Sequence, residues 1–160
     1  MLASFNIYLP PNPLPENGLP SVFLAGSIEQ GQASNWQLQL INYLSKSIDT
    51  INIFNPRRKD WDSTWVQSID NQQFREQVEW ELDGMDLADV ICLYFDPATS
   101  APISLLELGL HAGHKLIVCC PKGYWRKGNV DIVCARYNVP TVDTLLELAE
   151  AVTIRLKRIV

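Results

Sequence analysis

The sequence predicts an open α/β fold in three layers, flavodoxin- or Rossmann-like, with about five parallel strands covered by helices on both faces. Short apolar segments alternate along the chain with segments of helical periodicity. The segment 89–95, DVICLYF, is almost continuously apolar, as expected of a central parallel strand buried on both faces. With 160 residues, of which 47% are hydrophobic, the chain can form one well-buried core. We therefore expect a single α/β domain over residues 21–160.

Residues 1–20 hold five of the ten prolines in the chain. Proline lacks the backbone donor of a sheet ladder and biases the preceding residue toward extended conformations. These residues are expected to form an extended, proline-rich arm on the surface, and a partly disordered tail is equally compatible with the pattern.

The first two predicted strands each lead into a loop with polar or aromatic side chains. SVFLA, at 21–25, is followed by Gly26 and Ser27, then by a polar loop and a helix that starts near Trp36. TINIF, at 50–54, runs into a loop that contains Asn55, two arginines, Lys59, Trp61 and Trp65. This loop could stack a base or bind an anion. For Arg57, Arg58 and Lys59 a solvated surface position is the stronger reading.

The second half of the chain continues the alternation. Residues 71–88 show helical spacing, with Phe74, Val78, Leu82, Met85 and Ala88 on one arc and Glu81 inside that arc. After the strand at 89–95 we expect a loop at 96–103, a helix at 104–113 and a strand at 115–120. A short helix near 130–138, a brief strand at 139–142 and an amphipathic helix from about 143 complete the chain.

Composition excludes several kinds of partner. A net charge of −5 and a pI near 4.9 disfavour nucleic acid and anionic membrane surfaces, which require a basic face. No apolar run is long enough to cross a membrane and no secretory signal is visible, so we expect a cytoplasmic protein with a small-molecule partner. The four cysteines lack CxxC spacing and are expected to be buried and reduced, and we expect neither a metal nor an organic cofactor.

Parallel α/β sheets bind ligands beyond the carboxyl ends of their strands. The loops that follow Ala25, Phe54 and Phe95 all reach that edge of the predicted sheet. We therefore expect this edge to bring together Gly26, Ser27, Asn55, the Trp61 loop and the start of the helix that carries Glu107.

Glu107 is an acid in an apolar and small-residue setting, LLELGLHAG, and admits two explanations. Ser104-x-x-Glu107 matches a capping box, in which the glutamate folds back onto the helix N-terminus. Alternatively, the helix N-terminus holds the carboxylate ionised within an apolar wall, as suits a nucleophile.

Glu81 supplies a second carboxyl group that faces the core from the preceding helix. A border position, snorkelling to water or paired with an arginine such as Arg75, would also explain it. Two carboxyl groups about 5 Å apart, one a nucleophile and one a proton donor, can cleave a glycosidic bond through a covalent glycosyl-enzyme. Glu81 and Glu107 are therefore the candidate catalytic pair.

Three segments resemble the nucleoside 2-deoxyribosyltransferase superfamily, which includes deoxynucleotide N-hydrolases. They are VFLAGSI at 22–28, ELDGMDLADVICLYF at 81–95 and SLLELGLHAGHKLIVCCP at 104–121. The resemblance implies exchange of the base on a nucleoside, with Glu107 as nucleophile and Glu81 as the acid that handles the proton of the base. It also implies that Phe23 lines the sugar pocket and that Asn129 comes from a neighbouring subunit, and hence a homo-oligomer, dimeric or larger, whose partners are a nucleoside and a free base.

Three positions depart from the family pattern. Glu81 stands where the family usually has aspartate, and Ala101 stands where transferases often carry an aspartate six residues before the nucleophile. Glu29 stands where the hydrolase branch has an arginine that grips a 5′-phosphate, which favours nucleosides over nucleotides. Deoxyribosyl transfer is the expected activity, and hydrolysis of a nucleoside or nucleotide or a non-catalytic nucleotide-binding role remain the alternatives.

Overall fold

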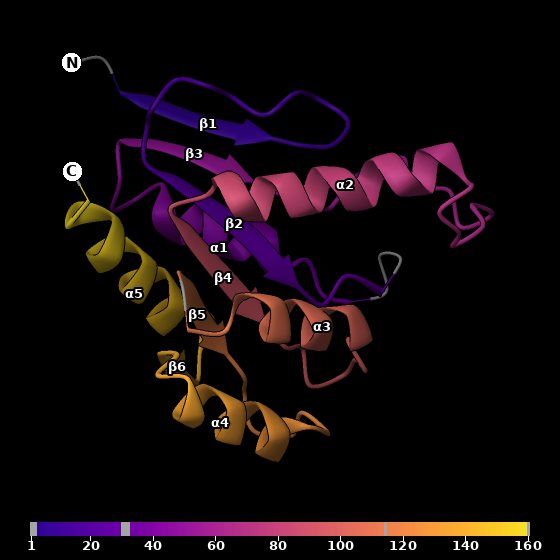
Figure 1. Ribbon diagram of the computed structural model, residues 1–160. Coiled ribbons are helices and arrows are strands. Elements are labelled where there is room, and N and C mark those ends of the chain that lie inside the picture. Colours follow the sequence, from indigo (N-terminus) through magenta and orange to yellow (C-terminus); the bar gives the residue numbers. More distant parts are fainter. Residues whose placement is uncertain (1–2, 30–32, 114, 160) are drawn as a thin grey trace.

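The computed structural model describes residues 3–29, 33–113 and 115–159, so part of the polar loop expected at 28–35 lies outside the described residues (Figure 1). The described chain forms one six-stranded, all-parallel sheet in the order β1-β3-β2-β4-β5-β6. Its strands are β1 (Ser4–Tyr8), β2 (Ser21–Gly26), β3 (Thr50–Phe54), β4 (Val90–Tyr94), β5 (Leu116–Cys119) and β6 (Thr141–Val142).

Helices cover both faces of the sheet, so the predicted three-layer α/β architecture is confirmed (Figure 1). On one face, α2 (Gln72–Leu87), α3 (Pro102–His111) and α4 (Lys127–Arg136) pack on side chains such as Phe23, Ile91 and Val118. On the other face, α1 (Trp36–Leu44) and α5 (Leu145–Lys157) pack on side chains such as Leu24 and Cys92. The alternation of consecutive strand residues between the two cores is what parallel strands with two covered faces require.

The sixth strand comes from the N-terminal segment that was expected to be an extended arm. Residues 4–8 pair in parallel with β3, from Ser4 beside Thr50 to Tyr8 beside Phe54. The prolines begin at Pro10, two residues beyond the last residue of the strand, so they do not interrupt the ladder.

The buried face of α2 differs from the arc expected from its apolar residues. Leu82 is 41% exposed, whereas the polar Gln77 is 3% exposed. The helix turns inward the residues spaced as i, i+3, i+4, i+7 and i+8, which are Gln77, Trp80, Glu81, Gly84 and Met85. The positions of the apolar residues alone predicted the wrong buried face for α2, because the true face includes the buried Gln77.

The helix that carries Glu107 begins two residues earlier than expected. Its first residue is Pro102. Proline suits this position because the N–H that it lacks would make no hydrogen bond within the helix. Ala101 is the N-cap, in a left-handed conformation with φ 46°, and no side chain of the helix caps it. Ser104 is therefore inside the helix, and the capping-box interpretation of Ser104 and Glu107 is wrong.

The four cysteines are buried and unpaired by disulfides, as expected. Cys119 and Cys120 contribute to opposite cores, one on each face of the sheet. Across the residues described, no helix combines the length and hydrophobicity that crossing a membrane requires.

Candidate active site

Two glutamates lie on the inner faces of α2 and α3, the helices that pack on the same face of the sheet. Glu107 lies in the second turn of α3 and is 8% exposed. Burial raises its pKa to about 8, and the negative charge of Glu81 adds to that increase. The charge of Glu81 therefore acts on the carboxyl group of Glu107.

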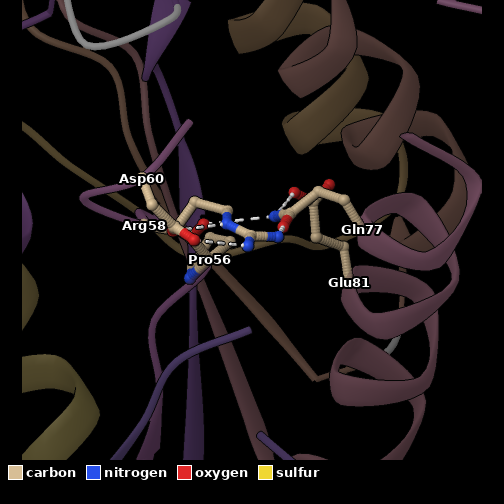
Figure 2. Close-up of polar contacts among 5 residues, drawn as sticks. All are labelled: Pro56, Arg58, Asp60, Gln77 and Glu81. Carbon is tan, nitrogen blue, oxygen red and sulfur yellow. Dashed lines mark hydrogen bonds and ion pairs between the residues drawn. The ribbon is translucent and has the colours of Figure 1, made fainter. Parts of the chain in front are cut away.

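Glu81 is half-buried on α2, and burial of its carboxyl group raises its pKa to about 7. A hydrogen bond from Gln77 Nε2 to Glu81 Oε1, 2.7 Å long, opposes part of this increase (Figure 2). Arg75 pairs instead with Glu79, at 3.8 Å, so the alternative in which Arg75 neutralises Glu81 is wrong. The inward-facing carboxyl group is therefore held by an amide and not by an opposite charge.

Two interacting carboxyl groups with raised pKa values titrate as a pair. With values of about 7 and about 8, the pair holds between one and two protons at pH 7, and the last proton to leave lies mainly on Glu107. Because Glu107 lies in the second turn of α3, away from the helix N-terminus, burial is the main cause of its shifted pKa. The expectation that this helix keeps Glu107 ionised in the unliganded protein is wrong.

The N-terminus of α3 is capped from a distant loop. Glu29 Oε1 accepts hydrogen bonds from Ser100 N at 2.7 Å, Ser100 Oγ at 3.0 Å and Ala101 N at 2.8 Å. The bond from Ala101 is the main cause of the lowered pKa of Glu29. Both Glu29 and Ala101 have positive φ, 44° and 46°, which non-glycine residues adopt at a cost of about 1 kcal/mol or more. This contact fixes the start of the helix that carries Glu107.

Ser27 organises the loop after β4. Its hydroxyl accepts hydrogen bonds from Asp96 N at 2.9 Å and Thr99 Oγ1 at 2.8 Å, and its backbone N–H donates to Tyr94 O. Asp96 in turn accepts from the hydroxyl of Ser34 at 2.8 Å. Ser27 thus ties the loop after β2 to the loop that leads into α3.

Phe23 and Gly26 both lie on β2, next to the central strand. Phe23 is fully buried beneath α2, with its ring 6.2 Å from that of Trp80. A Cβ at Gly26 would lie 2.3 Å from Tyr94 O, and its φ of 140° also suits only glycine. Packing between β2 and β4 therefore explains why glycine occupies this position.

The loop after β3 is more ordered by polar contacts than the sequence suggested. Asn55 is buried and its side chain accepts from Arg57 N, and Arg57 donates to Ala33 O and Ser34 O. Arg58 has an 11% exposed side chain and forms a two-pronged pair with Asp60, at 2.8 and 2.9 Å. The expectation of a solvated surface position is wrong for Arg58, whose side chain is nearly buried. Arg57 is half-buried and donates to two carbonyl groups, and Lys59 is exposed as expected.

The two tryptophans of this loop pack on each other. The rings of Trp61 and Trp65 lie 5.1 Å apart, and Arg58 lies 5.0 Å from the Trp65 ring centre. Trp61 Nε1 is buried and has no hydrogen-bond partner among the described residues.

Asn129 lies on α4, the helix that packs against β5, and its side chain is exposed on the surface of this single chain.

Two cavities lie on the α2 side of the molecule. The smaller, about 230 Å³, is bounded by the proline pair 10–11, by Arg58 and Trp65, and by α2 at Gln77. The larger, about 890 Å³, lies between Leu82, Leu110 and Lys115, at the amino ends of β4 and β5. The larger one is at the opposite end of the strands from the carboxyl edge, so volume alone does not mark the candidate site.

In residues 3–29, 33–113 and 115–159, no group of three His, Cys, Asp or Glu side chains is placed to hold a metal ion. Sequence reasoning missed Gln77, the capping role of Glu29 and the pairing of Arg58 with Asp60. The helix that starts at Pro102 has no capping side chain of its own, so its first backbone N–H groups require an acceptor from elsewhere in the chain. The sequence does not identify the residue that provides this acceptor.

Comparisons with known proteins agree with this architecture. A solved structure described as a conserved protein from Enterococcus faecalis V583 matches with a TM-score of 0.61 and 12% sequence identity, over 86% of this chain and 99% of that chain. This likeness shows a shared fold. No curated protein matches the chain. A family model described as "Nucleoside 2-deoxyribosyltransferase like" matches residues 19–124, which include β2, α2, β4 and α3 with both glutamates, and the chain belongs to that family.

Proposed function

We propose that this protein cleaves the N-glycosidic bond of a 2′-deoxynucleoside and transfers the sugar to another base, with Glu107 as nucleophile and Glu81 as the proton donor and acceptor. The observation that carries the proposal is the pair of coupled, buried carboxyl groups, with pKa values raised to about 8 and about 7. Membership in the nucleoside 2-deoxyribosyltransferase-like family supplies the substrate class.

The first half of the proposed reaction forms a covalent glycosyl-enzyme. One oxygen of ionised Glu107 attacks C1′ as the bond from C1′ to the base breaks, and the bonding electrons leave with the base. Protonated Glu81 donates its proton to that base, so a neutral base departs and Glu81 becomes a carboxylate. Because the pKa of Glu107 is raised further than that of Glu81, the proton of the singly protonated pair lies mainly on Glu107, and the reactive state forms when that proton lies on Glu81 instead.

The second half reverses the roles. A nitrogen of an incoming base attacks C1′, the ester to Glu107 breaks, and the proton of that base passes to Glu81. Burial of Glu107 among apolar neighbours limits the access of water, which competes with the base for the same carbon.

Phe23 is proposed to form the apolar floor of the sugar site. Its burial beneath α2, beside Trp80, supports this role. Asn129, exposed on α4, is proposed to complete the site of a neighbouring subunit in a homo-oligomer. Glu29 holds the start of α3 through its carboxylate, so this loop presents an acid where a 5′-phosphate would be repelled. We therefore propose nucleosides as substrates in preference to 5′-nucleotides.

Hydrolysis is the second candidate function, and the observation that favours it is Ala101. This residue, six positions before Glu107, has only a methyl side chain, and its backbone N–H donates to Glu29. The side chain at that position therefore offers a sugar hydroxyl no carboxylate, and the nearby carboxylate of Glu29 is already bound to the start of α3. A sugar that is held less firmly is less able to await a second base.

One incubation separates the two activities. The protein is incubated with deoxyinosine and free adenine, and products are followed by chromatography. Deoxyadenosine in the presence of protein indicates transfer, whereas hypoxanthine without deoxyadenosine indicates hydrolysis. Glu107→Gln removes the nucleophile with little change in shape and should abolish both products, while Glu150→Gln, an exposed change on α5, should leave the rate unaltered. Absence of product from all nucleosides tested with the unaltered protein would overturn the proposal.

A further inference from the structure

Gln77 is an unusual member of the buried face of α2. It is 3% exposed and lies one helical turn before Glu81. Burial of an amide is unfavourable unless its donors and acceptor are satisfied. Three hydrogen bonds join the Gln77 side chain to described residues, one to Glu81 and two to the loop after β3 (Figure 2).

The neighbours of Gln77 determine which way its amide points. Arg58 Nη1 lies 3.3 Å from Gln77 Oε1, and a guanidinium can only donate hydrogen bonds. Pro56 O lies 3.2 Å from Gln77 Nε2, and a carbonyl can only accept them. Both neighbours require the same orientation, because exchange of the amide oxygen and nitrogen would place donor against donor and acceptor against acceptor.

This orientation determines which oxygen of Glu81 can hold its proton. Gln77 Nε2 donates to Glu81 Oε1 at 2.7 Å, so Oε1 serves as an acceptor. A protonated Glu81 therefore holds its hydrogen on Oε2, the oxygen that this amide leaves open. Figure 2 shows the carboxyl group of Glu81 drawn toward Gln77 and the loop that contains Pro56 and Arg58.

Arg58 is itself held in place. Asp60 binds its guanidinium at two points, 2.8 and 2.9 Å, and the ring of Trp65 lies 5.0 Å away. Because Asp60 balances the charge of Arg58, the guanidinium acts on Glu81 mainly by orienting Gln77. Among the described residues, Glu107 on α3 is the titratable group whose pKa responds to the charge of Glu81.

We propose that Gln77, oriented by the Arg58–Asp60 pair, is a positioning residue that keeps the proton of Glu81 on Oε2, where it is available to the departing base. This inference rests on the proposed function of Glu81. It assigns to the loop after β3 a role in proton delivery, in addition to any contact with the substrate.

The leaving base tests this role directly. Deoxyinosine requires proton donation as hypoxanthine departs, whereas N7-methyl-2′-deoxyinosine already has a positive base that departs neutral without a proton. Gln77→Met keeps the approximate size of the side chain and removes its amide. We expect kcat on deoxyinosine to fall about 10- to 100-fold, with the methylated substrate affected less than about threefold.

The chain provides a matched control in the same helix. Gln72 Nε2 donates to Glu76 Oε1 at 2.8 Å with the same four-residue spacing, but on the exposed face of α2. Gln72→Met should leave both rates unchanged. Arg58→Lys, which keeps a donor but loses the fork to Asp60, should fall between the unaltered protein and Gln77→Met on deoxyinosine. Equal losses on both substrates in Gln77→Met, or no loss on either, would overturn the inference.

A second measurement needs no activity. In protein labelled with ¹³C at the glutamate carboxyl carbons, the Glu81 signal is assigned by its loss in Glu81→Gln and followed against pH. Since the Gln77 bond stabilises the ionised form, Gln77→Met should raise the apparent pKa of Glu81 by about one pH unit, and Gln72→Met should not. An unchanged titration would overturn the positioning role, whereas an inactive unaltered protein with the expected titration shift would overturn the proposed function and leave the positioning role standing.

Discussion

Glu107→Gln is expected to make the protein more stable at alkaline pH while it abolishes activity. Glu107 is 8% exposed, and its pKa rises from 4.5 to about 8 through burial and the nearby charge of Glu81. Between these two values the folded protein binds more protons than the unfolded chain, so the free energy of unfolding decreases as pH rises. The stability associated with protonated Glu107 is fully present below about pH 4.5 and is lost as pH rises through about 8.

The size of this effect follows from the two pKa values. Each pH unit between them is worth about 1.4 kcal/mol. Relative to pH 4.5, the raised pKa of Glu107 therefore lowers the free energy of unfolding by on the order of 3 kcal/mol at pH 7 and 4–5 kcal/mol well above pH 8. These are upper values, because part of the increase depends on the ionisation state of Glu81. Against a typical total of about 5–15 kcal/mol, the change is large enough to measure.

Urea unfolding followed by tryptophan fluorescence between pH 5 and 9 tests this reasoning. Glu107→Gln should match the unaltered protein near pH 5 and exceed it by up to about 3–4 kcal/mol near pH 8. Glu150→Gln replaces an exposed carboxylate on α5 and should follow the unaltered protein throughout. If all three proteins lose stability with pH at the same rate, Glu107 is not the buried, proton-holding group described above.

Three further outcomes follow from the fold. Glu29→Gln removes the charge that caps α3 and should lower the free energy of unfolding by about 1–2 kcal/mol in urea titrations; no loss would contradict the capping role. Gly26→Ala should cost more than about 3 kcal/mol because the new Cβ would lie 2.3 Å from Tyr94 O, whereas Gly109→Ala, with open space around its Cβ, should be neutral or stabilising by up to about 1 kcal/mol in the same assay. A thiol reagent should label the four buried cysteines slowly in the folded protein and rapidly in denaturant, and rapid labelling without denaturant would contradict their burial.

The order and type of most elements could be read from the sequence, because strand and helix periodicities follow directly from backbone geometry. TINIF at 50–54 forms β3 with the expected bounds, and DVICLYF contains β4. The segment before Pro10 was harder to classify. Its short alternating run acquires strand structure only through pairing with β3, a contact between residues about 46 positions apart.

The site shows the same division. Two glutamates on helices that flank one strand could be expected at the carboxyl edge from topology alone, and both lie on the inner faces of α2 and α3. The helix start at Pro102 could not be placed, because its cap is Glu29, 72 residues away from Ala101 in the chain. Capping patterns in the sequence compare residues only a few positions apart, so they cannot identify an acceptor from another loop.

The sequence by itself determined the layered α/β class, the buried central strand and the two acids, since these depend on periodicity and on the rarity of charge in apolar surroundings. Only the tertiary structure decided that Gln77 faces the core and that Arg58 orients it toward Glu81. Glutamine and arginine are polar side chains that sequence patterns assign to solvent. Their burial becomes favourable only when residues from separate segments supply hydrogen-bond partners at the correct distance, and folding alone brings those segments together.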